Sequence, residues 1–111
     1  PEPDDRAAVE VGRLVAHLAT LRRMSTSIAG QLDRGANPAV EAALVKDIGT
    51  TFEREVPEVF RRLLAVEATL GEGASYPENL GMTVLESPSF TLRGGTREIL
   101  RGMVARGLGL R

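Results

Sequence analysis

The stretch NPAVEAALVKDIGTTFEREVPEVFRRLLAVEATL, residues 37–70, decides the fold of this chain. Its apolar side chains recur every three or four residues, which is the spacing of an amphipathic α-helix. They are Val40, Leu44, Ile48, Phe52, Val56, Phe60, Leu63 and Leu70. Asn37 can cap a helix, and Pro38 suits the first helical position, where no N–H is needed. We therefore predict one long helix over 38–70, kinked near Glu53 because Pro57 cannot donate to that carbonyl.

A second amphipathic segment precedes this one. Apolar residues at helical spacing run from about Asp5 to Gln31, and Asp4 or Asp5 can cap the first turn. Gly35 can adopt the left-handed conformation that ends a helix. Because the connection to the next helix is short, we expect the two long helices to be antiparallel neighbours.

The segment after the second long helix is less regular. Residues 71–79 are rich in Gly, Pro and polar residues and predict a loop. We expect a short helix at 80–85, a break at 87–89, a brief extended stretch at 90–92 and a final helix at 96–106. The predicted fold is all-α, an antiparallel bundle of two long helices plus short C-terminal helices. Its apolar stripes need a further partner, either in a four-helix arrangement or on another subunit.

Composition narrows the function classes. The 111 residues suit one domain, and a net charge of −1 gives no field that would attract nucleic acid or an anionic membrane. There is no cysteine, and His17 is the only histidine, so we expect no metal site and assign His17 to a helix surface. No apolar run approaches the ~20 residues of a membrane span. The acidic start at 1–5 is interpreted as a cut or a linker.

The most informative stretch is SFTLRGGTREILRGMVARGLG, residues 89–109. Its core at 95–101 reads Gly-Thr-x-Glu-Ile-x-Arg and is followed by Val-Ala-Arg at 104–106. This stretch closely resembles the C-terminal signature of acyl-CoA dehydrogenases. The Asp-Arg-Gly turn at 33–35 and the Ala-Ala-x-x-Lys sequence at 42–46 are similar to the family more loosely. The resemblance implies that 1–111 is the C-terminal helical domain of a longer chain.

The resemblance also implies a chemistry. Family members use FAD and a carboxylate base to oxidise acyl-CoA thioesters between the α- and β-carbons, and they assemble as dimers or tetramers. In many members the base is a Glu two residues before the signature threonine. That position is Gly94 here, so no catalytic residue is assigned. Either the base lies on an earlier helix, or the chain is a non-catalytic partner subunit of a hetero-oligomer, and the sequence leaves both open.

Site residues follow from the same resemblance. Gly94, Gly95 and Arg93 are expected to bind the substrate, with the Gly94 N–H helping to hold the thioester carbonyl. Thr96 and Glu98 match positions that contact FAD, whereas Thr96 taken alone is interpreted as a plain helix N-cap. The family's Gln-x-x-Gly-Gly segment, which touches the FAD of a neighbouring subunit, has no counterpart at 60–66. The expected setting is fatty acid β-oxidation in the cytoplasm, in a homo- or hetero-oligomer with acyl-CoA as substrate.

Simpler interpretations compete with these. Four arginines in or near the signature could form a phosphate patch: Arg93, Arg97, Arg101 and Arg106. The i,i+4 spacing of two of them favours a solvated helix face instead. From periodicity alone, the chain could also be a stand-alone helical interaction module without a cofactor.

The second long helix carries its own charge cluster and a glycine. The charged side chains have helical spacing and predict ion pairs within that helix: Glu53, Glu55, Glu58, Arg61 and Arg62. Gly49 costs helix stability by about 1 kcal/mol relative to Ala, so we predict a packing constraint there.

Overall fold

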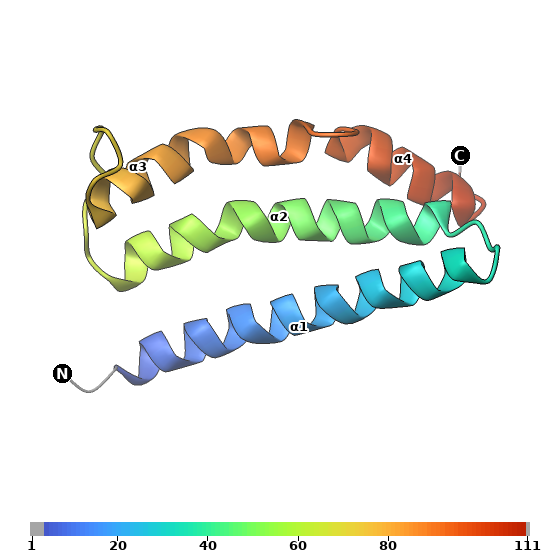
Figure 1. Cartoon of the computed structure of the whole chain (residues 1–111), viewed down its shortest axis with the longest axis horizontal. Coiled ribbons are helices and arrows are strands. Elements are labelled where there is room, and N and C mark those ends of the chain that lie inside the picture. Colours follow the sequence, from blue (N-terminus) through green and yellow to red (C-terminus); the bar gives the residue numbers. More distant parts are fainter. Residues whose placement is uncertain (1–3, 111) are drawn as a thin grey trace.

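The computed structural model of this chain describes residues 4–110, in which the regular elements are all helices and no strand is found. They are α1 (Asp5–Asp33), α2 (Ala39–Leu63), α3 (Tyr76–Glu86), the 3₁₀ helix η1 (Ser87–Leu92) and α4 (Arg97–Gly107). Figure 1 shows that α2 lies between α1 on one side and the α3–η1–α4 row on the other. The predicted all-α bundle with two long antiparallel helices is confirmed. Residues 1–3 of the predicted linker lie outside the described residues.

The hairpin of α1 and α2 follows the sequence prediction, except at its second start. The Asp4 carboxylate accepts from the Arg6 N–H at 3.2 Å and caps α1. Gly35 has φ 76° and turns the chain after α1. The prediction that Asn37 caps α2 is wrong, because Pro38 occupies the N-cap position and no side chain caps that end. The Pro38 carbonyl accepts from the Ala42 N–H at 2.8 Å and begins the helix.

α2 ends seven residues earlier than predicted. It passes through the buried Pro57 but ends at Leu63, and Ala65 then adopts φ 46°. The chain crosses toward α3, where the Thr69 N–H donates to the Pro77 carbonyl at 3.1 Å. Gly81 of α3 allows this approach, because a Cβ there would lie 2.1 Å from the Thr69 carbonyl oxygen. A backbone contact with α3 therefore replaces the last predicted turns of α2.

α3 begins earlier than predicted, at Tyr76 rather than residue 80. Ser75 and Glu78 form a capping box in which each side chain accepts from the other's main-chain N–H. This pattern is present in the sequence and accounts for the missed first turn. The extended stretch expected at 90–92 is also wrong, since those residues belong to η1. The final helix agrees with the prediction to within one residue at each end.

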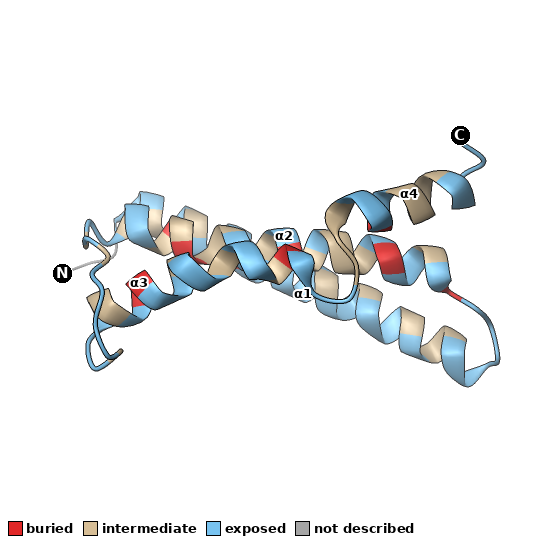
Figure 2. Ribbon diagram, turned by 90° about the horizontal axis from the view of Figure 1, so that it is seen from above, coloured by how far each residue is buried: buried red, intermediate tan, exposed pale blue. Residues whose placement is uncertain are grey.

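Burial centres on α2. Ala43 and Val59 of this helix are 4% and 1% exposed, and each flanking layer adds a buried leucine: Leu14 from α1, Leu80 from α3 and Leu100 from α4. Figure 2 shows these buried positions as short segments between long exposed stretches. The α1 layer and the α3–η1–α4 layer are therefore each held on α2 by a few buried side chains.

One side of α1 carries apolar residues that nothing in the described chain covers. Val15, Leu18 and Leu32 are 60%, 57% and 59% exposed and follow helical spacing. Single exposed apolar residues are ordinary, whereas a row of them along one helix is typical of an interaction surface. This row supports the expectation of a further partner.

Candidate functional site

The bend between η1 and α4 holds the five residues expected to bind substrate and cofactor. Gly94 and Gly95 have φ 62° and 117°, in the left-handed region that glycine tolerates best. A Cβ on Gly94 would lie 2.4 Å from Lys46 Nζ, and one on Gly95 would lie 3.3 Å from Leu100 Cδ2. The positive φ therefore favours glycine at both positions, and the atom that a Cβ at 94 would meet is the movable end of the Lys46 side chain.

Thr96 and Glu98 form the start of α4. The Thr96 hydroxyl oxygen accepts from the Ile99 N–H at 3.4 Å, so Thr96 is the N-cap of the helix. The pKa of Glu98 is lowered, first by its own main-chain N–H and then by the Thr96 hydroxyl. The Arg97 N–H of the same turn has no partner within the helix and can serve a ligand. The two predicted cofactor residues thus share one helix N-terminus.

Arg93, the third residue expected to bind substrate, is tied to α2. Its guanidinium donates to the Glu53 carboxylate at 2.7 Å and lies 5.0 Å from the centre of the Phe90 ring. The side chain is still 60% exposed. The ion pair with Glu53 therefore holds the bend against α2. The other N–H groups of the Arg93 guanidinium remain available to a ligand.

Arg97 and Arg101 are 32% and 60% exposed, so the solvated helix face expected from their spacing is partly correct, but both side chains also pair with an acid of α2. Arg101 Nε donates to Asp47 Oδ2 at 3.0 Å, and Arg97 Nε lies 3.5 Å from Asp47 Oδ1. Asp47 is largely buried, with 14% of its side chain exposed. Sequence spacing missed this arrangement because the shared acid belongs to α2, about fifty residues earlier in the chain. The pairing fixes α4, and hence the bend, on α2.

The predicted ion pairs within α2 are only partly correct. Glu58 and Arg61 do pair, at 3.0 Å. Glu53 instead pairs with Arg93, and Glu55 pairs with Arg13 of α1. The acids of α2 face both neighbouring layers, so they connect layers more than they stabilise their own helix. Gly49 also departs from the prediction, because a Cβ there would meet only Leu21 Cδ2, at an ordinary 3.9 Å.

Lys46 is the residue that sequence reasoning failed to assign to the site. It is the only lysine in the chain, and it closes the Ala-Ala-x-x-Lys sequence of α2. Its ammonium lies against Gly94, 48 positions later in the chain. The motif marked Lys46 as a feature of interest, but only the packing of the bend on α2 reveals what it faces.

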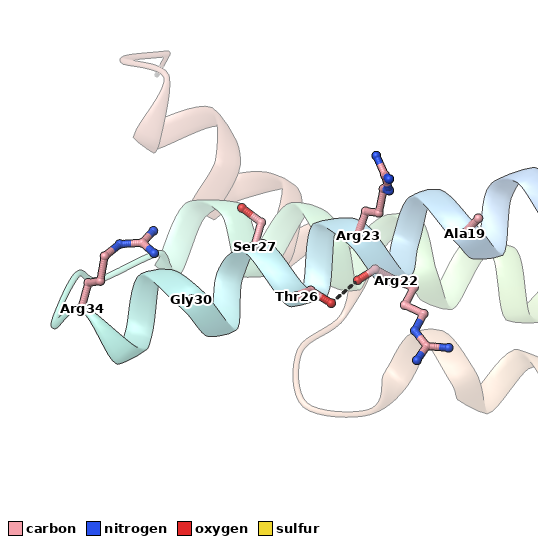
Figure 3. Close-up of a pocket in the computed structure, with 7 residues that line it drawn as sticks. All are labelled: Ala19, Arg22, Arg23, Thr26, Ser27, Gly30 and Arg34. Atoms are coloured by element: carbon pink, nitrogen blue, oxygen red, sulfur yellow. Dashed lines mark hydrogen bonds between the residues drawn. The ribbon is translucent and has the colours of Figure 1, made fainter.

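A separate hollow lies on the exposed side of α1. It encloses about 720 Å³ and is lined by Ala19, Arg22, Arg23, Thr26, Ser27, Gly30 and Arg34. Figure 3 shows its three arginines pointing in different directions, so they do not converge on one ligand. A smaller apolar cleft of about 270 Å³ lies between α2 and α3, beside Phe60 and Tyr76.

Two further observations concern metals and membranes. Residues 4–110 contain no group of three or more His, Cys, Asp or Glu side chains placed to hold a metal ion. His17 is exposed on α1 and meets the Phe52 ring edge-on, with ring centres 5.9 Å apart. Within the same range, every helix is too short or too polar to cross a bilayer.

Comparison with known proteins gives one match. The family described as acyl-CoA dehydrogenase, C-terminal domain, matches residues 5–109, which is nearly the whole chain. Neither the curated proteins nor the solved structures contain a match to this chain.

Proposed function

The chain belongs to the acyl-CoA dehydrogenase family through its C-terminal domain, and on that premise we propose that residues 1–111 complete the substrate and FAD sites of an acyl-CoA dehydrogenase. The intact protein would be a longer chain with oxidoreductase activity on acyl-CoA thioesters. One observation carries the proposal. The family match covers a double-glycine bend whose positive φ angles disfavour a side chain at positions 94 and 95.

The donors around this bend fit the cofactor and substrate proposed for it. Main-chain amides at a helix N-terminus donate to anionic or carbonyl oxygens, and both a flavin ring and a thioester present carbonyl oxygens. Thr96 and Glu98 would hold FAD, with the Glu98 carboxylate accepting from cofactor hydroxyl or N–H groups. Gly94, Gly95 and Arg93 would hold the acyl-CoA. When bound, FAD supplies the acceptor for the β-hydride.

The catalytic base is proposed to lie outside the described residues. Three carboxylates on the elements around the bend are engaged elsewhere: Asp47 with two arginines, Glu53 with Arg93, and Glu98 with its own N–H. Each of them already has a donor within the chain, so none is left to face a substrate α-carbon. Gly94 offers no carboxylate. The base would therefore come from an earlier helix of the same domain.

The absence of a side chain at Gly94 also favours one alternative, a non-catalytic partner subunit. Such a subunit would bind flavin or thioester at the bend while a different chain performs the chemistry. The exposed apolar row on α1 fits either assembly, because both need a covering neighbour. We propose a homo- or hetero-oligomer in the cytoplasm, acting in fatty acid β-oxidation, in which residues 60–66 do not supply the family's intersubunit FAD contact.

The experiment is a spectral assay of the purified full-length protein. A bound flavin that is bleached by acyl-CoA under anaerobic conditions supports the dehydrogenase. A bound flavin or thioester without bleaching, restored by a second purified subunit, supports the partner subunit instead. A folded protein that binds neither flavin nor acyl-CoA overturns the proposal and leaves a helical interaction module.

A further inference from the structure

Lys46 occupies the space that a side chain at position 94 would need. Its Nζ lies 2.4 Å from the place where a Cβ on Gly94 would stand. Lys46 is half-buried on the side of α2 that faces the bend. A positive charge therefore lies beside the position at which the family resemblance implies a carboxylate base.

The ammonium of Lys46 has no acidic partner in residues 4–110. Its sequence neighbour Asp47 is held by Arg97 and Arg101, and Glu53 of the next turns is held by Arg93. Glu98 accepts from its own N–H and from Thr96. The Lys46 ammonium forms no ion pair or side-chain hydrogen bond within the described chain, so its three N–H donors are available to a ligand. A ligand oxygen at the bend would satisfy this donor.

We infer that Lys46 is a substrate-binding residue whose ammonium donates to the carbonyl oxygen of the acyl thioester at the 94–95 bend. This inference rests on the proposed function and deepens it. When the α-proton leaves to a carboxylate base, the electron pair of the broken C–H bond is shared with that oxygen. The Lys46 ammonium stabilises the resulting enolate charge. A full charge acts on this oxygen more strongly than main-chain amides alone.

A substrate-binding role of Lys46 is distinguished from a structural role by measuring the pKa of the bound ligand. A 3-oxoacyl-CoA loses its acidic α-proton without oxidation, and its enolate can be followed by ultraviolet absorbance. The full-length flavin-loaded protein is titrated with pH in the presence of this ligand. An opposite charge within about 4–6 Å shifts a pKa by 1–3 units. Lys46→Met should therefore raise the pKa of the bound ligand by roughly 1–3 units, whereas Lys46→Arg should leave it near the native value.

Arg62→Met is the matched control, since it also removes one cation from α2. Arg62 lies sixteen residues from Lys46, roughly 24 Å along the helix, and should leave the ligand pKa unchanged. Lys46→Gln provides a second neutral variant if the methionine variant does not fold. A neutral variant that binds the ligand with the native pKa overturns the inference while the proposed function stands. The inference is also overturned if Lys46→Met changes the pH–rate profile of catalysis but leaves the pKa of the bound ligand unchanged. The Lys46 charge would then act on the catalytic base and not on the ligand. Failure of the native protein to bind flavin and thioester refutes the proposed function itself.

Discussion

Replacing Gly81 by alanine should destabilise the contact between α3 and residues 66–70, the crossing segment that leads from the end of α2 to α3. This loss is expected even though alanine forms helices better than glycine. A Cβ at position 81 would lie 2.1 Å from the Thr69 carbonyl oxygen and 2.9 Å from its carbonyl carbon. Both are backbone atoms, so the segment must move as a unit. The same movement weakens the bond from the Thr69 N–H to the Pro77 carbonyl, which is 3.1 Å long.

The magnitude follows from three terms. Overpacking costs about 1–3 kcal/mol. The lost main-chain hydrogen bond costs about 1 kcal/mol. Alanine regains about 1 kcal/mol through helix propensity. The expected net loss is about 1–3 kcal/mol, which corresponds to roughly 5- to 150-fold faster amide exchange in α3 at 1.4 kcal/mol per tenfold.

Gly49→Ala is the matched control in α2. Its Cβ would meet only Leu21 Cδ2 at 3.9 Å, so the substitution should slow exchange in α2 through a propensity gain of about 1 kcal/mol. Hydrogen exchange with mass spectrometry on the full-length protein reads both helices in one experiment. If Gly81→Ala leaves α3 as protected as in the native chain, the close approach of Thr69 is wrong. If Gly49→Ala instead speeds amide exchange in α2, the conclusion that position 49 has room for a Cβ is wrong.

Three other predictions concern the helices that frame the bend. Asp47→Ala removes the carboxylate that accepts from Arg101 Nε and pairs with Arg97, so exchange in α4 should become roughly 5- to 150-fold faster, from a cost of about 1–3 kcal/mol. Native exchange rates contradict the pairing. The pKa of Glu98 is lowered, so its contribution to α4 is complete above the ordinary glutamate pKa of about 4.3 and is lost as pH falls through the lower folded value. A carbon-13 NMR titration should give a Glu98 midpoint below about 4.3, and an ordinary midpoint refutes the capping contact. Ser75→Ala should cost α3 about 1 kcal/mol by removing its capping box, measured by exchange of the first turn. Ser89→Ala, which removes only a back-bond to the Glu86 carbonyl, should cost less, and equal effects argue against the box.

Local signals predicted most of the helices and their ends. Apolar periodicity located α1 and α2, a glycine marked the turn at Gly35, and the Thr96 cap marked the start of α4. The end of α2 was missed because Leu70 continues the periodicity, yet it lies in the crossing segment and is 78% exposed. Ala65, not a glycine, makes the left-handed turn that stops the helix. Such a turn is set by the packing of residues 66–70 on α3 and has no local signature.

The candidate site was predictable in outline only. The double glycine and the cap at 94–96 are readable from the sequence and place the bend before a helix. The tertiary contacts that shape the bend are not, because they join residues about fifty positions apart. Asp47 pairs with two arginines of α4, and the Lys46 ammonium lies against Gly94, because α4 and η1 pack on α2. Helical spacing describes neighbours on one helix and carries no information about such cross-layer partners.

The most direct test of the account is a crystal structure of the full-length protein with an acyl-CoA bound. We predict that the thioester carbonyl oxygen lies within hydrogen-bond distance of the main-chain amides at 94–96, with the flavin ring beside Thr96. A well-ordered thioester and flavin that both lie away from this bend would contradict the account.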